Sequence, residues 1–172
     1  IIVKDTLKGN ICVNNEELDD LIIQRVDGSV TYNMSVVVDD IDMGITNTIR
    51  GDDHLNNTFR QMHIMKALGY KAPIYTHIPL IMGEDRKRLS KRHGATSTYE
   101  FRKKGILSIS IINYLVRLGW AEGNKEKFSV EELIELFNLK NLNKSSSTFD
   151  YKKLNSLNKY FIKEVETIDL YN

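Results

Sequence analysis

The spacing of apolar side chains predicts a hairpin and a helix near the start of the chain. Residues 21–24 and 29–32 are rich in strand-forming side chains and flank Asp27-Gly28, a pair typical of hairpin turns because both positions tolerate positive φ. In residues 34–41 the apolar positions recur at i, i+3, i+4 and i+7, the spacing of a helix. Three consecutive valines in this segment would also suit a buried strand. The longer periodicity favours the helix.

Two strand-loop-helix units follow. Residues 45–49 are predicted to form a strand that ends before residues 50–53, and residues 55–65 a helix that ends at Gly69. A second strand is predicted within residues 72–82, an apolar stretch that contains both prolines of the chain. Because strands alternate with helices, we predict an α/β fold with a parallel sheet, whose ligands bind beyond the carboxyl ends of the strands.

The later part of the chain is predicted to be helical. Residues 109–119 carry apolar side chains on one helical face. Ser129 and Glu132 form a capping box that predicts a helix start before residues 133–137. A further amphipathic pattern covers residues 153–161.

The composition is that of a folded protein without the charge of a generic polybasic binder. Of the 172 residues, 41% are apolar and 27% charged, and the formal net charge is +1, which argues against disorder. The charge is uneven, because residues 1–60 carry a net −6 and the remainder +7. Residues 84–104 hold eight basic and three acidic side chains. Such a run is commonly a solvated loop, but it could also face phosphate groups.

Cysteine and histidine usage excludes several classes of site. Cys12 is the only cysteine, so the chain cannot build a disulfide or a thiolate zinc cluster by itself, and we expect a cytoplasmic protein. No apolar run approaches the roughly 18 residues of a membrane span, and we expect no membrane association. The four histidines lack the spacing of metal ligands, and we predict no metal site. The chain opens on Ile1-Ile2-Val3 without an initiator methionine, which we interpret as a fragment cut within a strand.

The clearest candidate chemistry lies in Arg88-Leu89-Ser90-Lys91-Arg92. A loop with several cations and a hydroxyl can surround a phosphate chain, and phosphoryl transfer depends chiefly on positioning and charge neutralisation. Lys91 is the best candidate for the electrostatic stabiliser. The loop lacks the glycine spacing of a P-loop, and the chain contains no Gly-x-Gly-x-x-Gly motif. Contacts to phosphate must therefore come from side chains.

This segment, with His93-Gly94-Ala95 after it, resembles the second signature of class I aminoacyl-tRNA synthetases in the variant typical of bacterial-type glutamyl-tRNA synthetases. The resemblance extends over nearly the whole chain. Further segments resemble that family in the same order and spacing, namely residues 31–33, 37–40, 43–46, 49–54 and 113–120. Arg88 departs from the family, which usually has lysine there. Arginine keeps the charge but changes its reach and donor geometry.

The resemblance implies an architecture of three parts. Residues 1–18 would end an inserted acceptor-binding domain, and residues 19–98 would form the second half of a class I synthetase Rossmann-like nucleotide-binding fold with parallel strands. Residues 99–172 would form an α-helical stem-contact domain. Nothing in the chain resembles the histidine-containing first signature of the class. We therefore expect the C-terminal part of a catalytic domain, inactive in isolation.

The resemblance also implies roles for individual residues. The glutamate-binding positions of the family match Tyr32, Arg50, Gly51, Asp52, Asp53 and His54. The ATP-binding positions match Asp53, Ile81, Arg88, Leu89, Ser90, Lys91 and Arg92. Among these, Lys91, Arg88 and Arg92 are assigned the catalytic role of facing the phosphates. Apart from the resemblance, Arg50 could form a structural ion pair with Asp52 or Asp53, and Tyr32 could be a half-buried core tyrosine.

The implied function is ATP-dependent activation of L-glutamate to glutamyl-adenylate and transfer to tRNA(Glu). The full-length ligase would be monomeric and would use ATP with Mg²⁺. Discrimination against glutamine would rest on charge, with Arg50 facing a carboxylate. Two alternatives stay open: a truncated synthetase-like enzyme that glutamylates a modified tRNA nucleoside, and a non-catalytic tRNA-binding module. The predicted helices within residues 129–160 favour the full synthetase over the truncated enzyme.

Overall fold

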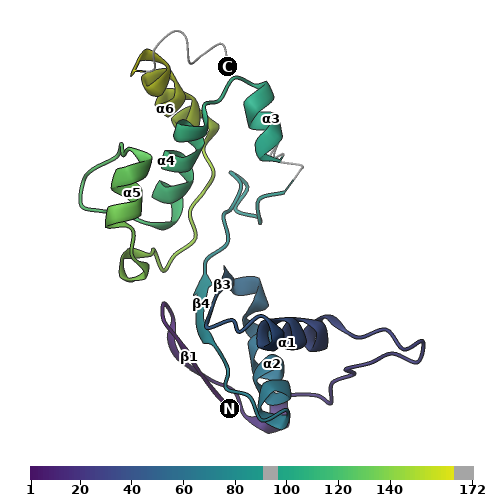
Figure 1. The fold of residues 1–172 in the computed structure, drawn as a ribbon. Helices are drawn as coiled ribbons and strands as arrows, with labels where there is room; N and C mark the ends of the chain where they lie inside the picture. Colours follow the sequence, from purple (N-terminus) through teal and green to yellow (C-terminus); the bar gives the residue numbers. More distant parts are fainter. Residues whose placement is uncertain (91–96, 165–172) are drawn as a thin grey trace. The chain divides into compact units, whose positions relative to one another are not determined.

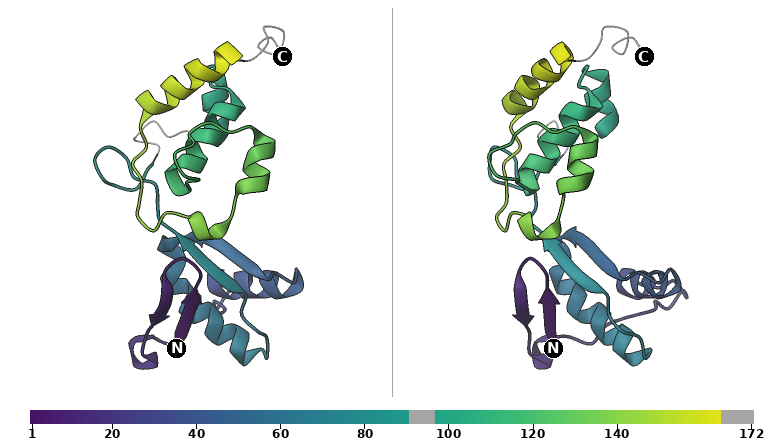
Figure 2. Two further views of the ribbon diagram at one scale, coloured as in Figure 1. Left: turned by 90° about the vertical axis from the view of Figure 1, so that its left-hand side faces the viewer. Right: turned by 60° about the vertical axis from the view of Figure 1, so that its left-hand side comes forward.

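The computed structural model describes residues 1–90 and 97–164, which fall into two compact units, residues 1–78 and 79–172 (Figure 1). The first unit contains the sheet and the second is largely helical (Figure 2). The domain boundaries expected from the resemblance, at 18/19 and 98/99, do not coincide with this division. As boundaries between functional domains they stay predictions.

A four-stranded mixed sheet organises the first unit. Its strands are β1 (Ile2–Asp5), β2 (Gly9–Cys12), β3 (Asn47–Gly51) and β4 (Ile74–Ile78), in the order β2-β1-β4-β3. β4 is parallel to both β1 and β3, whereas β1 and β2 form an antiparallel pair. The predicted α/β fold with parallel strands is confirmed for this unit.

Two helices accompany the sheet, α1 (Tyr32–Asp42) and α2 (Leu55–Ala67), together with the short 3₁₀ helices η1 (Asn15–Glu17) and η2 (Asp52–His54). Both predicted helices are confirmed. Phe59 of α2 packs with Val3 and Tyr75, so that α2 covers one face of the sheet. This apolar contact orients α2 against β1 and β4.

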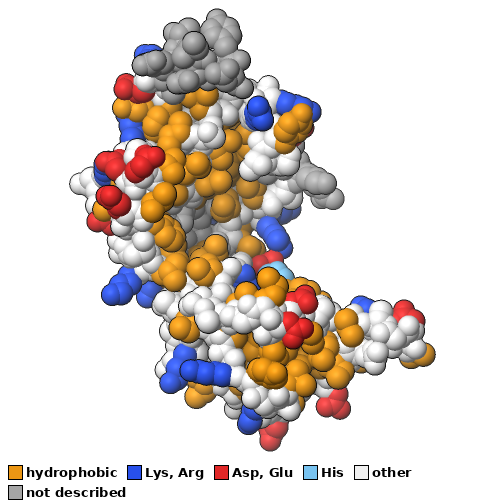
Figure 3. Space-filling view, viewed as in Figure 1, with side chains coloured by type: hydrophobic (Ala, Val, Ile, Leu, Met, Phe, Trp, Pro, Cys, Tyr) orange, Lys and Arg blue, Asp and Glu red, His pale blue; other side chains and the backbone are white. Residues whose placement is uncertain are grey.

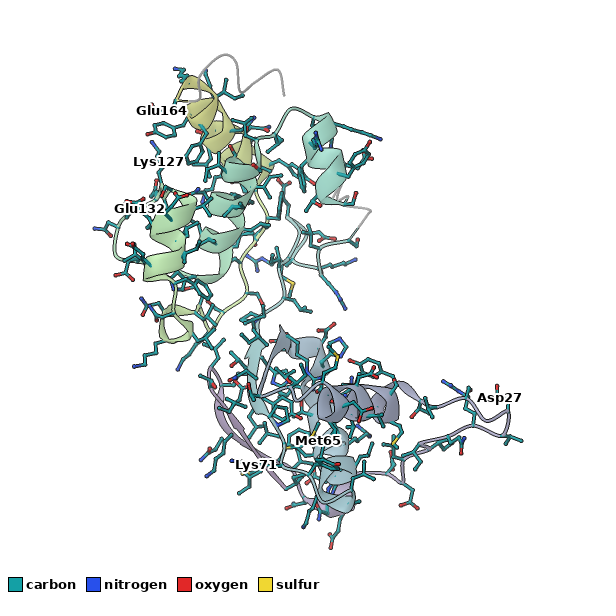
Figure 4. All side chains as sticks on the ribbon, viewed as in Figure 1. Asp27, Met65, Lys71, Lys127, Glu132 and Glu164 are labelled. Carbon is teal, nitrogen blue, oxygen red and sulfur yellow. The ribbon has the colours of Figure 1, made fainter. Side chains whose placement is uncertain are left out.

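The predicted hairpin is much shorter than its pattern indicated. The segment that carries Asp27 projects away from the first unit (Figure 4), and its two sides share one isolated bridge, between Gln24 and Val30. The tight turn is present, with Gly28 at a φ of +84°. Val26 is fully exposed. Because the apolar side chains of this arm find no core to pack against, the pairing does not extend.

Both predicted strand boundaries need correction. β3 begins at Asn47 and runs to Gly51, so Arg50 lies within the strand and not in the loop after it. β4 ends at Ile78 and does not reach Met82, because Pro79 has no N–H for a ladder hydrogen bond. Beyond the proline the backbone turns to partners in the second unit, such as the Ser147 carbonyl, which accepts from Met82 N–H.

The second unit is built from α3 (Thr98–Lys103), α4 (Ser108–Gly119), α5 (Val130–Leu136), η4 (Leu139–Asn141) and α6 (Tyr151–Glu164). The three predicted helices are confirmed as α4, α5 and α6. Both halves of the capping box at the start of α5 are formed, between Ser129 and Glu132. Glu132 lies on the outer surface together with Lys127 (Figure 4).

Two apolar clusters hold these helices together. One contains Phe101, Tyr114, Phe149 and Leu154, and the other Trp120, Phe128 and Leu133. The buried side chain of Asn113 on α4 donates to the carbonyl oxygen of Phe128 at 2.9 Å and accepts from its N–H at 2.8 Å. No helix in the described part of the chain is long and apolar enough to cross a membrane.

Candidate functional site

Arg50 is held on the sheet by three neutral hydrogen-bond partners. The register pairs it with His77 on β4, and its Nε donates to His77 Nε2 at 3.2 Å. Its Nη2 donates to Thr58 Oγ1 and to Gln61 Oε1, each at 2.8 Å. Its guanidinium carbon also lies 5.6 Å from the centre of the Tyr75 ring. A residue on β3 is thus anchored by β4 on one side and by α2 on the other.

His77 is in turn held by Asp5 from β1. The ring Nδ1 lies 2.7 Å from Asp5 Oδ2, and the backbone N–H of His77 donates to the same oxygen at 2.9 Å. The other oxygen, Oδ1, accepts from the backbone N–H groups of Leu7 and Lys8 at 2.9 and 2.8 Å. Burial alone would raise the pKa of Asp5, but the hydrogen bonds from Lys8, His77 and Leu7 together lower it. Asp5 is therefore an ionised carboxylate although it is buried.

The hydrogen bonds determine which nitrogen of His77 carries the proton. Arginine has only donors, so the Nε2 that faces Arg50 must accept, and the proton lies on Nδ1 towards Asp5. Burial lowers the pKa of His77, and the positive charge of Arg50 acts in the same direction, against the opposing effect of Asp5. His77 is accordingly neutral at physiological pH.

The charge of Arg50 is not neutralised by a direct ion pair within residues 1–90 and 97–164. The carboxylate of Asp52 instead pairs with Lys8 at 2.9 Å, so an Arg50–Asp52 pair is not formed. The charge of Arg50 also acts on Asp40 without direct contact. Burial raises the pKa of Asp40, and the positive charge of Arg50 offsets part of that increase. The described residues give Nη1 of Arg50 no hydrogen-bond acceptor. Nη1 is therefore the part of the guanidinium suited to an anionic ligand.

Tyr32 and His54 meet beside this network. The Tyr32 hydroxyl lies 3.1 Å from His54 Nδ1, and Asn57 Nδ2 lies 3.3 Å from the same nitrogen. Since an amide nitrogen can only donate, Nδ1 is the acceptor and Tyr32 donates as well. Tyr32 is 49% exposed and is not one of the buried core residues. Both the structural alternative and the glutamate-binding role of this half-buried tyrosine stay predictions. Thr58 connects the two clusters, because its hydroxyl also lies 3.3 Å from the carbonyl oxygen of His54.

The remaining predicted residues of the first unit lie in the same turn. Gly51 ends β3 opposite Ile78, and Asp52, Asp53 and His54 form η2 directly after it. Asp53 is exposed and Gly51 partly buried. The predicted glutamate-binding residues of this unit are thus gathered around the end of β3 and the start of α2.

In the second unit, the backbone that leads into the predicted signature and includes its first two residues forms a small hairpin. Leu89 N–H donates to the Ile81 carbonyl at 2.9 Å, and Gly83 N–H donates to the Lys87 carbonyl at 2.8 Å. Arg86 in the turn adopts a φ of +61°. Ile81 and Leu89 pack against the cluster around Phe101.

Further hydrogen bonds tie this hairpin to the segment before α6. Met82 N–H donates to the Ser147 carbonyl at 2.9 Å, and its own carbonyl accepts from Phe149 N–H at 2.8 Å. The side chains of Arg88 and Ser90 are exposed. Lys91 and Arg92 lie outside the described residues. Their predicted roles stay predictions.

The first unit also has an apolar groove away from this site. Apolar side chains gather on the face of the unit formed by α1 and α2 (Figure 3), where Leu18, Leu21, Met34 and Ile64 line a groove of about 460 Å³. None of the predicted glutamate-binding residues lines it. Within the described ranges there is also no group of three histidine, cysteine, aspartate or glutamate residues placed to hold a metal ion.

Sequence reasoning missed the residues that hold Arg50. Asp5, Thr58, Gln61 and His77 are all nearly inaccessible to solvent. The one available signal was chemical, because Thr76 and His77 are polar residues in an otherwise apolar strand. Buried polar groups need hydrogen-bond partners. Only the arrangement of the strands shows that the partners of His77 are Arg50 and Asp5.

The fold is one found in the catalytic domain of class I aminoacyl-tRNA synthetases. The chain belongs to the family described as class I tRNA synthetases (E and Q), catalytic domain, whose model matches residues 1–156. That match runs through α5 into α6 and does not separate a stem-contact domain from the catalytic domain. The narrower assignment to the C-terminal part of the domain is not supported by it.

Relatives within the family carry a common name. The glutamate–tRNA ligase of Francisella tularensis subsp. tularensis is 56% identical over 166 residues, 96% of this chain and 36% of that protein. Glutamate–tRNA ligase 1 of Alkalilimnicola ehrlichii is 52% identical, over 96% of this chain and 35% of its own. The chain thus spans little more than a third of the length of these relatives.

A solved structure agrees with the fold. The crystal structure of a glutamate tRNA ligase from Elizabethkingia meningosepticum, in complex with its amino acid, has a TM-score of 0.88 and 30% sequence identity. The match covers 96% of this chain and 37% of that one.

Proposed function

We propose that this chain is part of a glutamate–tRNA ligase that activates L-glutamate with ATP and transfers it to tRNA(Glu). The observation that carries the proposal is Arg50, a half-buried guanidinium held by neutral acceptors and without a carboxylate partner among the described residues. An anchored arginine whose charge is not neutralised is suited to a carboxylate ligand. The names of the relatives at 52 to 56% identity support the same conclusion.

The proposed reaction has two steps. An oxygen of the glutamate α-carboxylate attacks the α-phosphorus of ATP, and the bond to pyrophosphate breaks to leave glutamyl-adenylate. A hydroxyl at the 3′ end of the tRNA then attacks the adenylate carbonyl, and AMP leaves. Lys91, Arg88 and Arg92 would face the phosphates, where Mg²⁺ bound with ATP would neutralise further negative charge. Ile81, Leu89 and Ser90 would complete the nucleotide contacts.

In this proposal Arg50 selects glutamate by charge. Its Nη1 would donate to the side-chain carboxylate, and Tyr32 and His54 would line the same pocket with Gly51, Asp52 and Asp53. Glutamine offers a neutral amide at this point. Leaving the guanidinium without an anionic partner would cost about 3 to 5 kcal/mol, by analogy with a broken buried ion pair.

The finer assignments belong to the proposal as well. Residues 19–98 would be the second half of the nucleotide-binding fold, in the C-terminal part of the catalytic domain, and residues 99–172 the stem-contact domain. The helical second unit and the net positive charge after residue 60 support contact with tRNA phosphates. We further propose that the full-length ligase acts as a monomer in the cytoplasm.

The helices α5 and α6 favour the full synthetase over the truncated enzyme that modifies a tRNA nucleoside. Both lie in the extension that the truncated enzyme should lack, and the family match includes α5 and the start of α6.

Glutamate-dependent ATP–pyrophosphate exchange by the full-length ligase tests the function. We expect exchange with glutamate and much less with glutamine. Lys91→Ala should lower kcat far more than it changes the KM for glutamate, because the contact strengthens as charge builds on the leaving pyrophosphate. The matched control is Lys87→Ala, an exposed lysine of the same hairpin. If wild-type protein binds tRNA but shows no exchange, the non-catalytic module is correct instead.

A further inference from the structure

Behind Arg50 lies a buried pair that no part of the proposed mechanism uses, Asp5 and His77. We propose that this pair positions the guanidinium of Arg50 for the glutamate carboxylate, with the unprotonated Nε2 of His77 as the acceptor that sets its orientation. The inference rests on the proposed role of Arg50. It makes Asp5 and His77 positioning residues, since neither is placed to touch substrate.

The hydrogens of the Arg50 guanidinium are divided between its anchors and a ligand. Arginine offers five N–H donors in a planar fork, and its long side chain has much rotamer freedom to lose on binding. His77 takes the hydrogen on Nε, while Thr58 and Gln61 take the two on Nη2. These three contacts define both the plane and the rotation of the guanidinium. The two hydrogens of Nη1 are left to meet a ligand, in a direction that the anchors determine.

The acceptor that His77 presents to Arg50 is neutral. A carboxylate in direct contact with Arg50 would form an ion pair and weaken the attraction for the carboxylate of the substrate. Here the negative charge lies one residue further away, on Asp5, where three backbone N–H groups and the imidazole already satisfy it. Asp5 thus orients His77, and His77 orients Arg50, while the negative charge of Asp5 stays out of contact with Arg50.

The protonation of His77 depends on the groups that face its ring. The charged groups around His77 are Asp5 on β1, Lys8 in the turn after it and Arg50 on β3, whereas α2 presents the neutral Thr58 at 3.0 Å from Nε2. Nε2 of His77 lies 3.2 Å from Nε of Arg50. If Nε2 carried a proton, two donors would face each other and the hydrogen bond would be lost. Asp5 prevents this arrangement by holding the single ring proton on Nδ1.

Two substitutions at one position separate orientation from packing. In His77→Gln the longer side chain can bring an amide oxygen near the position of Nε2 and accept from Arg50. In His77→Asn the shorter side chain can donate to Asp5 but does not reach Arg50. Both variants remove the ring from the same buried place, so a purely structural role would affect both alike. Their melting temperatures are measured beside the kinetics.

In the full-length ligase we expect His77→Asn to raise the KM for glutamate about tenfold or more, with the KM for ATP and kcat changed less than about threefold. His77→Gln should recover most of the wild-type KM for glutamate. The inference is overturned if glutamate exchange is normal in wild type and the KM for glutamate of His77→Asn is unchanged. It is also overturned if His77→Gln is as impaired as His77→Asn. Absence of glutamate activation in wild type would instead refute the proposed function.

A second measurement does not depend on catalysis. The ¹⁵N chemical shifts of the His77 ring in the full-length protein report which nitrogen carries the proton. We expect a protonated Nδ1 and an unprotonated Nε2 at neutral pH. A proton on Nε2, or a doubly protonated ring, would leave Arg50 without its acceptor and would overturn the positioning role.

Discussion

Removal of the Arg50 guanidinium should impair glutamate activation more than any other single change in the first unit. The side chain combines three neutral anchors with an Nη1 that has no acceptor among the described residues. In Arg50→Ala both the ligand contact and the positive charge are lost. In Arg50→Lys the charge stays, but a single ammonium cannot reproduce the planar fork that His77, Thr58 and Gln61 hold.

The magnitude follows from the burial of the group. Breaking a buried, hydrogen-bonded charge pair by removing one partner costs about 3 to 5 kcal/mol. At about 1.4 kcal/mol for each factor of ten, this is a loss of roughly a hundredfold to a few thousandfold in kcat/KM for glutamate. Arg50→Lys should fall between wild type and Arg50→Ala, because the Coulomb attraction is partly kept.

The assay is ATP–pyrophosphate exchange by the full-length ligase, with glutamate and with glutamine. Arg60→Ala is the matched control, since Arg60 lies on α2 and, among the described residues, its side chain donates to the backbone of its own helix, at Asn56. We expect Arg50→Ala to lower the ratio of kcat/KM for glutamate over glutamine. The reasoning is refuted if kcat/KM for glutamate stays within about threefold of wild type, or if both amino acids lose activity in parallel.

Three further predictions concern stability, measured by urea denaturation of the chain. Asn113→Ala should lower the free energy of unfolding by about 2 to 4 kcal/mol, because it leaves the buried N–H and C=O of Phe128 without partners; a loss below about 1 kcal/mol would contradict this. Ser129→Ala should cost about 1 kcal/mol through the lost helix cap, and Ser129→Asp should restore most of it. Burial lowers the pKa of His77 below its ordinary 6.5 in the folded chain. As the pH drops below about 6.5, His77 is therefore protonated more readily in the unfolded chain than in the folded one, and stability should fall. His77→Gln should lack this part of the pH dependence, and an equal dependence in both proteins would show that His77 is not its source.

Local patterns predicted most of the helices because the information for each lies in adjacent residues. The periodicity before residue 42 and the capping box at Ser129 each needed only a few neighbouring side chains. Strand ends were less certain. β3 includes Arg50 because its partner β4 continues opposite it, and β4 stops at Pro79 because the ladder loses a donor there. The hairpin around Asp27 failed to extend because its strands have no core to cover.

The sequence by itself predicted the class of the protein, most of its helices and the approximate positions of β3 and β4, because motif identity and hydrophobic spacing are properties of the chain. What only the tertiary structure decided is how Arg50 is held. Its partners come from β1, β4 and α2, and the contact of His77 with Asp5 joins residues 72 positions apart. Hydrogen bonds of this kind depend on strand register and helix packing, which bring together groups that no local pattern connects. The protonation of His77 follows from that arrangement, since a histidine shows which nitrogen accepts only when its neighbours are known.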